Sequence, residues 1–428
     1  MNFIKMKLKF MLLNLFKSNF QVKKIIVIKI FWYLCIFIFS PVGFIIFILI
    51  RIIKPLILIR IQLLISERIG HFSGNTELYL CELDAGVNKP KGRFIDIWYN
   101  NYPICNYQLN RMIKRKLHVF PTFLFSSVNY FNTLFPGGDI HRIGDNSAND
   151  RDVHNLLDQY PAHIQFTERE EKKGLDGLLA LGIEKGSKFI CLHIRDDSYL
   201  KSALPWRDWS YHDYRNCNIQ NYGKAALELA EMGYYVIRMG VKVKEPLNVF
   251  HPKIIDYSYN GLRSDFMDIY LGAKCEFCIS NGTGFDGVPY IFRRPILYVD
   301  HVPIGIISTF SDKFLITVKK HWSREKKRFL TIQEIFEMNA AYYMSSREDG
   351  LGIGVDLYES TPEEIKSVVL EMESRVRGSW KITKEDEDLQ KKFWKHFQKV
   401  DDIGNVWHGE IRAKIGSDFL RSNIDLLR

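Results

Sequence analysis

A histidine, an arginine and a tyrosine follow an apolar run near the middle of the chain. Residues 188–194 read as a strand, and His193, Arg195 and Tyr199 lie at its end in Cys-Leu-His-Ile-Arg-Asp-Asp-Ser-Tyr. A guanidinium at a strand end is always charged and can bind a phosphate through two parallel hydrogen bonds. The polar, aromatic residues 196–217 could fold over such a ligand. The spacing predicts an anion site, and the alternative is that His193 and Arg195 only finish the strand.

A second group consists of small residues after another predicted strand. The stretch Ser-Asn-Gly-Thr-Gly contains Ser280, Gly282, Thr283 and Gly284. Small residues between a strand and a helix let backbone N–H groups approach a diphosphate, assisted by the helix dipole. The stretch is neither a GxGxxG nor a Walker loop, so ordinary turn formation is the alternative. Together with the first group it predicts a diphosphate site at two neighbouring strand ends.

Two further groups could contact the same ligand. Arg238 ends a third predicted strand, just before Gly240, and could reach the same anion. Ser264, Asp265 and Asp268 begin a predicted helix, where a carboxylate could accept from a base or a ribose hydroxyl. Helix capping is the simpler use of Ser264.

The N-terminal half has its own polar turn after a strand over residues 56–65. Arg68, His71, Asn75 and Glu77 follow that strand. His71 and Glu77 are candidate general bases, because such a base works best with a pKa near the operating pH. Arg68 and Asn75 are candidates for substrate contact. A structural role is the alternative for each of them.

The sequence offers no evident metal site. It has no HExxH, no P-loop, no GxSxG and no DxD at a strand end, and the acidic residues 385–388 read as a solvated helix start. Cys275 and Cys278 form a CxxC without a second pair, so packed thiols are the better interpretation. We therefore expect no metal and no cofactor, with arginines and helix dipoles neutralising phosphate charge.

Hydrophobic periodicity predicts the elements that position these residues. From residue 188 onward, strands alternate with helices, which is typical of a doubly wound parallel sheet whose ligands lie beyond the carboxyl ends of its strands. Earlier strands are expected at 56–65, 94–98 and 117–120. Later strands are expected at 188–194, 234–239, 254–256, 277–280 and 296–299, and helices at 220–232, 264–273, 361–375 and 384–400.

The net charge of +10 belongs to the N-terminus. Residues 1–65 contain ten Lys or Arg and no acid, which leaves 49 basic and 49 acidic side chains in the rest (59 − 10 = 49). An electroneutral body disfavours nucleic-acid binding. Residues 31–50 are uncharged and long enough to cross a bilayer, although Pro41 and Gly43 make a kink or a hairpin as plausible as a straight span. A buried core helix is the less favoured interpretation.

These patterns predict an α/β protein with four parts. We expect a membrane anchor over residues 1–55 and an N-terminal Rossmann-like domain over 56–175. A C-terminal domain that binds the diphosphate is expected over 176–345, and helices bracing the two domains over 346–428.

The stretch from His193 to Tyr199 resembles the HxRxGDY-like motif of fucosyltransferase-type glycosyltransferases of the GT-B fold. The resemblance implies that Arg195 contacts the diphosphate of a sugar nucleotide, and that residues 282–284 form the small-residue turn on the same group. It also implies a GT-B-like architecture, with two Rossmann-like domains facing a cleft. The N-terminal domain (56–175) would then be the acceptor domain and the C-terminal domain (176–345) the nucleotide-sugar-binding domain. The wider pattern over about residues 56–375 looks like a bacterial family of predicted membrane-associated glycosyltransferases. Asp196 and Asp197 stand where fucosyltransferases often carry a second Arg and a Gly, which departs from the pattern for GDP-fucose.

The expected function is transfer of a hexosyl or deoxyhexosyl group from a nucleotide sugar to a glycan or lipid-linked acceptor. Such a reaction belongs to bacterial cell-surface polysaccharide synthesis, lipopolysaccharide included, and is expected to be inverting and metal-independent. The expected location is the cytoplasmic face of the inner membrane. The alternatives are a sugar-nucleotide 2-epimerase, which would need no acceptor, and a catalytically inactive membrane scaffold.

Overall fold

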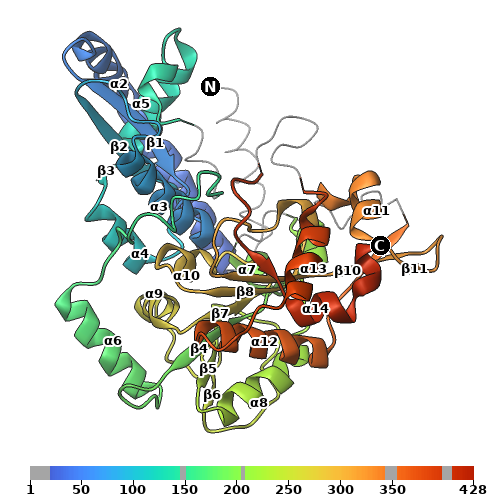
Figure 1. Ribbon diagram of the computed structural model, residues 1–428. Helices are drawn as coiled ribbons and strands as arrows, with labels where there is room; N and C mark the ends of the chain where they lie inside the picture. The colour runs from blue at the N-terminus through green and yellow to red at the C-terminus, as the bar shows by residue number, and fades with distance from the viewer. Residues whose placement is uncertain (1–19, 145–150, 204–207, 343–353, 398–406) are drawn as a thin grey trace. The chain divides into compact units, whose positions relative to one another are not determined.

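The computed structural model describes residues 20–144, 151–203, 208–342, 354–397 and 407–428 (Figure 1). The chain forms two compact units. Unit 1 comprises residues 1–150 together with His163–Gln165, and unit 2 comprises Arg151–Ala162 and Phe166–Arg428. The boundary predicted at residue 175 falls inside a helix of unit 2, α6 (Glu168–Ala180).

Unit 1 is built on a parallel three-stranded sheet in the order β1-β2-β3. Each strand coincides with a predicted apolar run, and helices connect the strands as parallel pairing requires. The elements are α2 (Phe20–Ile53), β1 (Leu58–Leu64), α3 (Ile69–Ala85), β2 (Phe94–Asn100), α4 (Tyr107–Lys114), β3 (His118–Phe120), α5 (Thr122–Leu134) and the 3-10 helix η1 (Asp139–His141).

The two faces of this sheet are covered by different helices. Because side chains alternate along a strand, Ile97 and Tyr99 of β2 point to one face and Asp96 and Trp98 to the other. The first face packs against α2 and α5 in one apolar core: Phe47, Ile50, Ile61, Ile97, Tyr99, Phe125 and Val128. On the second face, Trp98 contacts Tyr79 of α3 edge to face at 4.7 Å.

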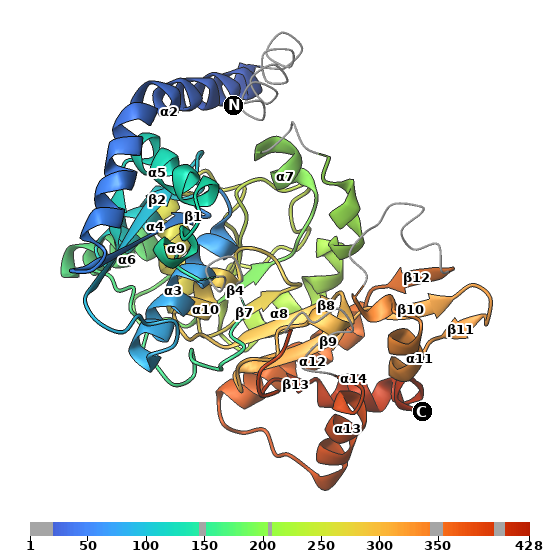
Figure 2. The same cartoon turned by 90° about the horizontal axis from the view of Figure 1, so that it is seen from above.

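The apolar segment is one continuous helix, α2, so the chain does not fold back within residues 31–50. Pro41 lies inside α2 and removes one backbone hydrogen bond, and Figure 2 shows that the helix bends along its length. Within the described residues, Ile30–Ile53 is long and apolar enough to cross a membrane, by length and composition alone.

Two of the basic residues that follow this segment form hydrogen bonds within unit 1. Arg60 is 3% exposed and binds Asp96 through two bonds, Nε to Oδ1 at 2.7 Å and Nη2 to Oδ2 at 2.5 Å. Arg51 donates to the backbone oxygens of Phe135 and Pro136. Of the three cations expected just after the apolar segment, Lys54 is the exposed one.

Unit 2 is built on a seven-stranded sheet in the order β13-β9-β8-β7-β4-β5-β6, with every pair parallel. The first strand of this sheet in sequence, β4, is an inner strand. The next two strands are added on one side of it, and the chain then crosses over to add the others on the opposite side. The strands are β4 (Phe189–His193), β5 (Tyr235–Arg238), β6 (Ile254–Asp256), β7 (Cys278–Ser280), β8 (Ile296–His301), β9 (Phe314–Val318) and β13 (Lys414–Ile415).

Helices cover both faces of this sheet, as expected for a doubly wound fold (Figure 1). Apolar residues of α8 and α12 pack on the face that includes Ile190, Leu192 and Val236. The helices are α6, α7 (Ser198–Ala203), η3 (Ser210–Arg215), η4 (Ile219–Tyr222), α8 (Gly223–Glu231), α9 (Asp265–Lys274), α10 (Gly287–Ile291), η5 (Ile304–Ile306), α11 (Ile332–Glu337), η6 (Ala340–Tyr342), α12 (Pro362–Val376), α13 (Lys384–Trp394), α14 (Ser417–Ser422) and η7 (Ile424–Leu427).

Unit 2 also contains a small antiparallel sheet that the periodicity did not predict. It pairs β10 (Lys320–Ser323) with β11 (Arg328–Phe329) and β12 (Val355–Tyr358). All seven cysteines are free thiols, and Cys275 and Cys278 are buried. The packed-thiol interpretation of the CxxC is therefore confirmed.

Candidate functional site

The strand order of unit 2 places the two strongest motifs side by side. Strands β4 and β7 are neighbours, with His193 opposite Ser280 in register, and they flank the point where the order of addition reverses. Ligands of doubly wound sheets bind beyond the carboxyl ends of the strands at this switch point. The loops after His193 and Ser280 leave the sheet there, so this is the candidate site.

A direct hydrogen bond joins the two loops. Thr283 Oγ1 lies 2.9 Å from Nδ1 of His193. Asp286 holds the turn from within, because its carboxylate accepts from Thr283 N at 3.0 Å and from Ser280 Oγ at 3.2 Å. His193 also stacks on Phe285 with a ring separation of 5.1 Å. The sequence-predicted His193, Ser280 and Thr283 therefore form one connected group.

Gly282 has a backbone conformation and surroundings that favour glycine. Its φ is +80°, and a Cβ added there would lie 3.0 Å from Nε2 of His301. Left-handed φ values cost an L residue about 1–2 kcal/mol. Gly284 follows on the same turn, immediately before the buried Phe285.

Asn281 connects three loops at the switch point. Its side chain is 1% exposed, accepts from the backbone N–H of Arg195 at 2.9 Å and donates to the backbone oxygen of Arg215 at 2.8 Å. Arg215 ends η3 and donates in turn to the backbone oxygen of Gly282. The arginines at 195 and 215 are thereby positioned by backbone hydrogen bonds around the same turn.

Lys319 holds the loop that carries Arg215. Lys319 is 4% exposed, and its ammonium group donates to the backbone oxygens of Tyr214 and Asn216 at 3.1 and 2.6 Å.

Asp196 connects the loop after β4 to the loop after β5, since its carboxylate accepts from Ser198 N and Lys244 N, both at 2.8 Å. The loops around the site are therefore cross-linked by buried or half-buried polar groups.

Burial shifts the pKa values of two histidines and one aspartate at the site. It lowers the pKa of His193 to about 4, with the positive charge of Arg238 adding to the effect. It likewise lowers the pKa of His301 to about 3, with help from Arg215. Burial raises the pKa of Asp286 to about 7. Near neutral pH the two imidazoles are uncharged, so the positive charge at the switch point comes from arginine.

Three further residues that the sequence predicted for the site, Arg238, Gly240 and Tyr199, are not bonded to the turn after β7 by the contacts described above. Arg238 is 1% exposed, and its Nη1 donates to Ser258 Oγ at 2.5 Å and lies 3.5 Å from Asp256 Oδ1. This placement favours a structural role for the Arg238 guanidinium. Gly240 follows β5, and an added Cβ would lie 2.5 Å from Val243. Tyr199 is half-buried in α7.

The start of α9 uses its polar residues for helix capping and pairing. Ser264 accepts from Met267 N at 3.2 Å as the N-cap. Asp268 accepts from Arg263 at 2.6 Å, and burial raises its pKa to about 6. Asp265 lies 3.4 Å from the same guanidinium. Ser264 therefore caps the helix, which is the simpler of the two roles considered for it.

The four predicted residues of unit 1 lie on or next to α3. Arg68 precedes the helix and is exposed, His71 lies in its first turn, and Asn75 is buried further along. Glu77 is fully buried, and its Oε1 accepts from the backbone N–H of His163 at 3.0 Å. At about 100° per residue, positions 71 and 77 point to different sides of α3. The placement of Glu77 favours a structural role, whereas His71 lies at the carboxyl end of β1.

Three residues of the site were missed by the sequence interpretation: Arg215, Asn281 and Asp286. Asn281 belongs to the recognised small-residue stretch and Asp286 follows its end by two residues. Polar residues within such a turn are a usable signal. Arg215 ends the polar loop expected to fold over a ligand, but nothing in its spacing separates it from the other cations there. Only the contact between η3 and the turn after β7 identifies it.

No family model matches the chain, and no curated protein matches it either. Among solved structures, the chain is similar to the ADP-heptose lipopolysaccharide heptosyltransferase II of E. coli, with 14% identity and a TM-score of 0.38 over 66% of this chain and 98% of that one. A glycosyl transferase family 9 structure from Veillonella parvula gives 12% identity and a TM-score of 0.39 over 74% and 96%.

A third similar structure is a putative UDP-N-acetylglucosamine 2-epimerase from Listeria monocytogenes. It gives 8% identity and a TM-score of 0.24 over 56% of this chain and 79% of that one. Identities and TM-scores at these levels assign neither a family nor an activity to the chain.

Proposed function

We propose that the protein is a GT-B-type glycosyltransferase that moves a sugar from a nucleotide-sugar donor to a glycan or lipid-linked acceptor. The observation that carries the proposal is the switch point between β4 and β7, where Arg195, Arg215 and the turn after Ser280 come together. Two positive side chains beside a glycine turn suit a nucleoside diphosphate. A role in cell-surface polysaccharide synthesis, lipopolysaccharide included, completes the proposal.

In the proposed reaction, an acceptor hydroxyl attacks the anomeric carbon from the side opposite the nucleotide. The new C–O bond forms as the bond between that carbon and the β-phosphate oxygen breaks, and the nucleoside diphosphate leaves with the bonding electrons. Arg195 and Arg215 would neutralise the charge that develops on the leaving group. Donors fixed in advance are effective in this role because they need no reorganisation during reaction.

The acceptor proton needs a base, and His71 is our candidate. It lies in the first turn of α3 at the carboxyl end of β1, the usual location for chemistry in parallel α/β units. Glu77 is the weaker candidate because its carboxylate is buried and bonded to His163. Arg68 and Asn75 would contact the acceptor.

We propose that phosphate charge is neutralised by arginine and backbone N–H groups, without a metal at the donor. The carboxylate nearest the turn, Asp286, is occupied by hydrogen bonds from Ser280 and Thr283. Asp196 is likewise occupied by two backbone N–H groups. Both carboxylates are therefore committed to loop structure.

The test is binding of a panel of nucleotide sugars to the full-length protein, by thermal shift and calorimetry. Removing a charged hydrogen-bond partner costs about 1.5–3 kcal/mol, so Arg195→Ala is expected to raise the Kd of the bound donor about 10–150-fold. Arg324→Ala is the matched control, because Arg324 is exposed and pairs with Asp356 at 2.6 Å in the small sheet. Equal affinity of wild type and Arg195→Ala would contradict the site assignment.

The same donor, once found, separates the alternatives. A glycosyltransferase consumes it in the presence of an acceptor and releases the nucleoside diphosphate. A 2-epimerase would change the sugar without an acceptor, which NMR of the donor alone detects. An inactive scaffold would bind no member of the panel, and a triple variant of His71, Glu77 and Arg195 would leave glycan assembly in cells intact.

We further propose that α2 attaches unit 1 to a membrane together with α5. Trp32 stacks on Tyr102 at 4.2 Å, and Phe47 lies 5.9 Å from Phe131 of α5. Gly43 brings α2 so close to α5 that an added Cβ would lie 2.7 Å from Ser127 Oγ. Packing at several points along α2 supports a helix that lies against its unit rather than one that leaves it.

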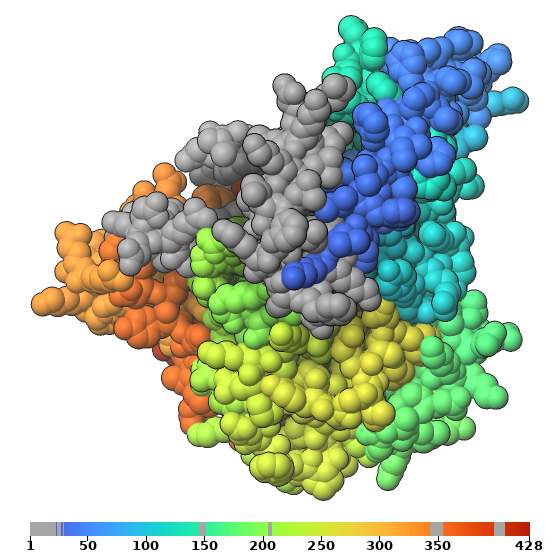
Figure 3. Space-filling view, turned by 180° about the vertical axis from the view of Figure 1, so that it is seen from behind, coloured from blue at the N-terminus to red at the C-terminus, as the bar shows by residue number. Residues whose placement is uncertain are grey.

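The opposite side of α2 is apolar and open, and α2 lies at the surface of its unit (blue in Figure 3). Phe37, Ile38, Ile45 and Ile52 are each more than half exposed. The whole of α5 is uncharged, and its Leu134 is 56% exposed. Lipid would cover both surfaces, and the seven lysines before residue 30 would attract anionic headgroups.

Flotation with vesicles containing anionic lipid tests this attachment. The Ile45→Asp and Leu134→Asp variants are each expected to reduce the floated fraction, since each places a charge on the lipid-facing surface. Leu179→Asp is the matched control, because Leu179 is 58% exposed on α6 of unit 2. If Leu134→Asp floats like wild type, α5 is not part of the attachment. We place this surface on the cytoplasmic side, where lysine-rich segments stay.

A further inference from the structure

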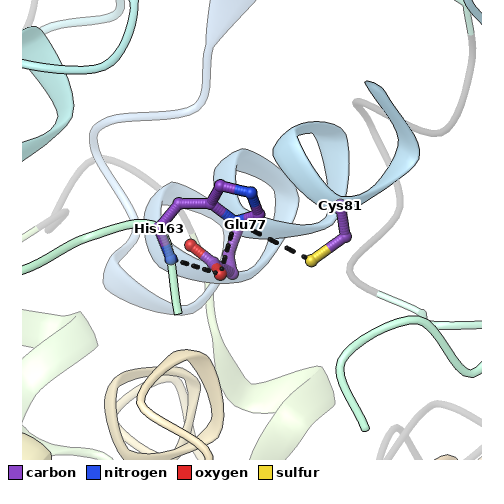
Figure 4. A group of neighbouring side chains, drawn as sticks. All are labelled: Glu77, Cys81 and His163. Carbon is purple, nitrogen blue, oxygen red and sulfur yellow. Dashed lines mark hydrogen bonds and ion pairs between the residues drawn. The ribbon is translucent and has the colours of Figure 1, made fainter. Parts of the chain in front are cut away.

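A histidine, a glutamate and a cysteine converge in unit 1, and none of them belongs to the candidate donor site of unit 2. Glu77 and Cys81 are four residues apart, so they share one face of α3, and both are fully buried. His163 comes from residues 163–165, a short segment of unit 1 whose flanking residues on both sides belong to unit 2. Figure 4 shows its imidazole directed at the other two side chains.

The distances within this group suit a tetrahedral metal ion. Nδ1 of His163 lies 3.0 Å from Glu77 Oε1 and 4.0 Å from Cys81 Sγ, and all three ligand atoms lie within 4.8 Å of one another. Zinc bonds of about 2.0–2.3 Å in a tetrahedron place neighbouring ligand atoms about 3.3–3.7 Å apart. The two distances from Nδ1 of His163 therefore differ from this range by about 0.3 Å each.

The other imidazole nitrogen is held as metal-binding histidines usually are. Nε2 of His163 lies 2.9 Å from Oδ2 of Asp84, one turn further along α3. Metal-ligating histidines almost always donate their second N–H to a carboxylate or carbonyl, which fixes the tautomer and strengthens the ligand. Asp84 would thereby orient Nδ1 toward Glu77 and Cys81.

A second cluster of possible ligands differs from the group on α3 because it contains a lysine. Cys217, Asp300 and Glu359 also cluster, but the ammonium group of Lys319 lies 3.8 Å from Glu359 and supplies the positive charge there. In the group on α3, the ring that faces both carboxylates is that of His163, at 3.0 Å from Glu77 and 2.9 Å from Asp84.

We propose that Glu77, Cys81 and His163 bind one zinc ion, with the second oxygen of Glu77 or a water molecule completing the tetrahedron. Binding requires an unprotonated Nδ1 on His163 and a thiolate at Cys81, so the thiol proton is released as the ion enters. The ion would fasten residues 163–165 to α3. The zinc proposal does not rest on the transfer reaction proposed above, and in it Glu77 is a metal ligand and not a base.

The alternative is an ion pair without metal, and Cys81→Ser distinguishes the two. The serine keeps Glu77, His163 and Asp84 in place, so an ion pair survives, but it removes the thiolate that favours zinc. The full-length protein is purified without chelator, and bound zinc is measured by mass spectrometry and by competition with a chromophoric chelator. We expect one zinc per chain in wild type and at least a 100-fold higher Kd in Cys81→Ser. Cys105→Ser, another thiol of unit 1, is the control.

Cobalt gives a readout that does not depend on stability. Co²⁺ in wild type should show a sulfur-to-cobalt charge-transfer band and tetrahedral d–d bands, and Cys81→Ser should lose the first. Asp84→Asn is expected to weaken zinc binding about 10–100-fold while keeping both bands. Circular dichroism confirms that each variant is folded. Zinc binding that is equal in wild type and Cys81→Ser, or absent from both, would overturn the proposal.

Discussion

Replacing Asn281 with alanine tests whether one buried side chain holds the candidate donor site together. The amide accepts from Arg195 N and donates to Arg215 O, with bonds of 2.9 and 2.8 Å, and the residue is 1% exposed. Alanine leaves both backbone groups without this partner. A buried polar group that loses its partner costs about 1–3 kcal/mol, so with two such groups Asn281→Ala is expected to destabilise unit 2 by about 2–6 kcal/mol.

The effect on ligand binding follows from the same two bonds. Without the amide, Arg195 and the end of η3 remain joined through the bond from Cys217 N to Arg195 O at 3.1 Å, so both guanidinium groups are held less firmly. Donor affinity is expected to fall even under conditions where the variant is folded. The Asn281→Asp variant keeps an acceptor for Arg195 N but not the donor to Arg215, so it should lie between wild type and alanine.

The assay combines urea unfolding with calorimetry of the donor that the panel identifies. Asn260→Ala is the control, because Asn260 accepts from Leu262 N at 3.0 Å in an exposed turn and should change stability by less than about 0.5 kcal/mol. If Asn281→Ala changes the free energy of unfolding no more than Asn260→Ala and binds the donor equally well, then the amide does not organise the site.

Three further outcomes are expected. Gly282→Ala should cost about 1–3 kcal/mol in urea unfolding and weaken donor binding, because the residue has a positive φ and a Cβ would crowd His301; a neutral effect would mean that the turn relaxes freely. The pKa values of His193 and His301 are lowered to about 4 and about 3, so the unfolded chain binds more protons below pH 6.5 and stability should fall as the pH drops from about 6.5 to 4. The double variant His193→Gln, His301→Gln should flatten that pH dependence of unfolding, and an unchanged slope would show that other groups cause it. Arg60→Ala strands Asp96 in the core and should cost about 3–5 kcal/mol by urea unfolding, whereas a loss under 1 kcal/mol would show that water reaches that carboxylate.

Local patterns in the sequence predicted most elements that lie around the candidate site. The capping box at Thr361 begins α12, and Ser264 caps α9, as their spacing indicates. The apolar runs at 188–194 and 277–280 became β4 and β7 within one residue or two. These signals are local, because caps and strand runs depend on neighbours a few residues apart.

Contacts between distant segments could not be predicted in the same way. β13 is two residues long and is added to the sheet beside β9, about one hundred positions earlier in the chain. The small sheet of β10, β11 and β12 is antiparallel and lacks a clear alternation in sequence. Arg60, counted among the membrane-flanking cations, pairs with Asp96 from the neighbouring strand.

The sequence alone determined where charge and apolar residues lie along the chain, and which residue types stand at strand ends. The cationic, acid-free residues 1–65 and the motifs at His193 and Ser280 are visible there because they need no partner to be recognised. Only the tertiary structure decided which strand ends are neighbours, that Asn281 joins Arg195 to Arg215, and that Glu77 meets His163 instead of standing as an open base. Those outcomes depend on hydrogen bonds between residues 66 to 86 positions apart, and chain spacing does not encode them.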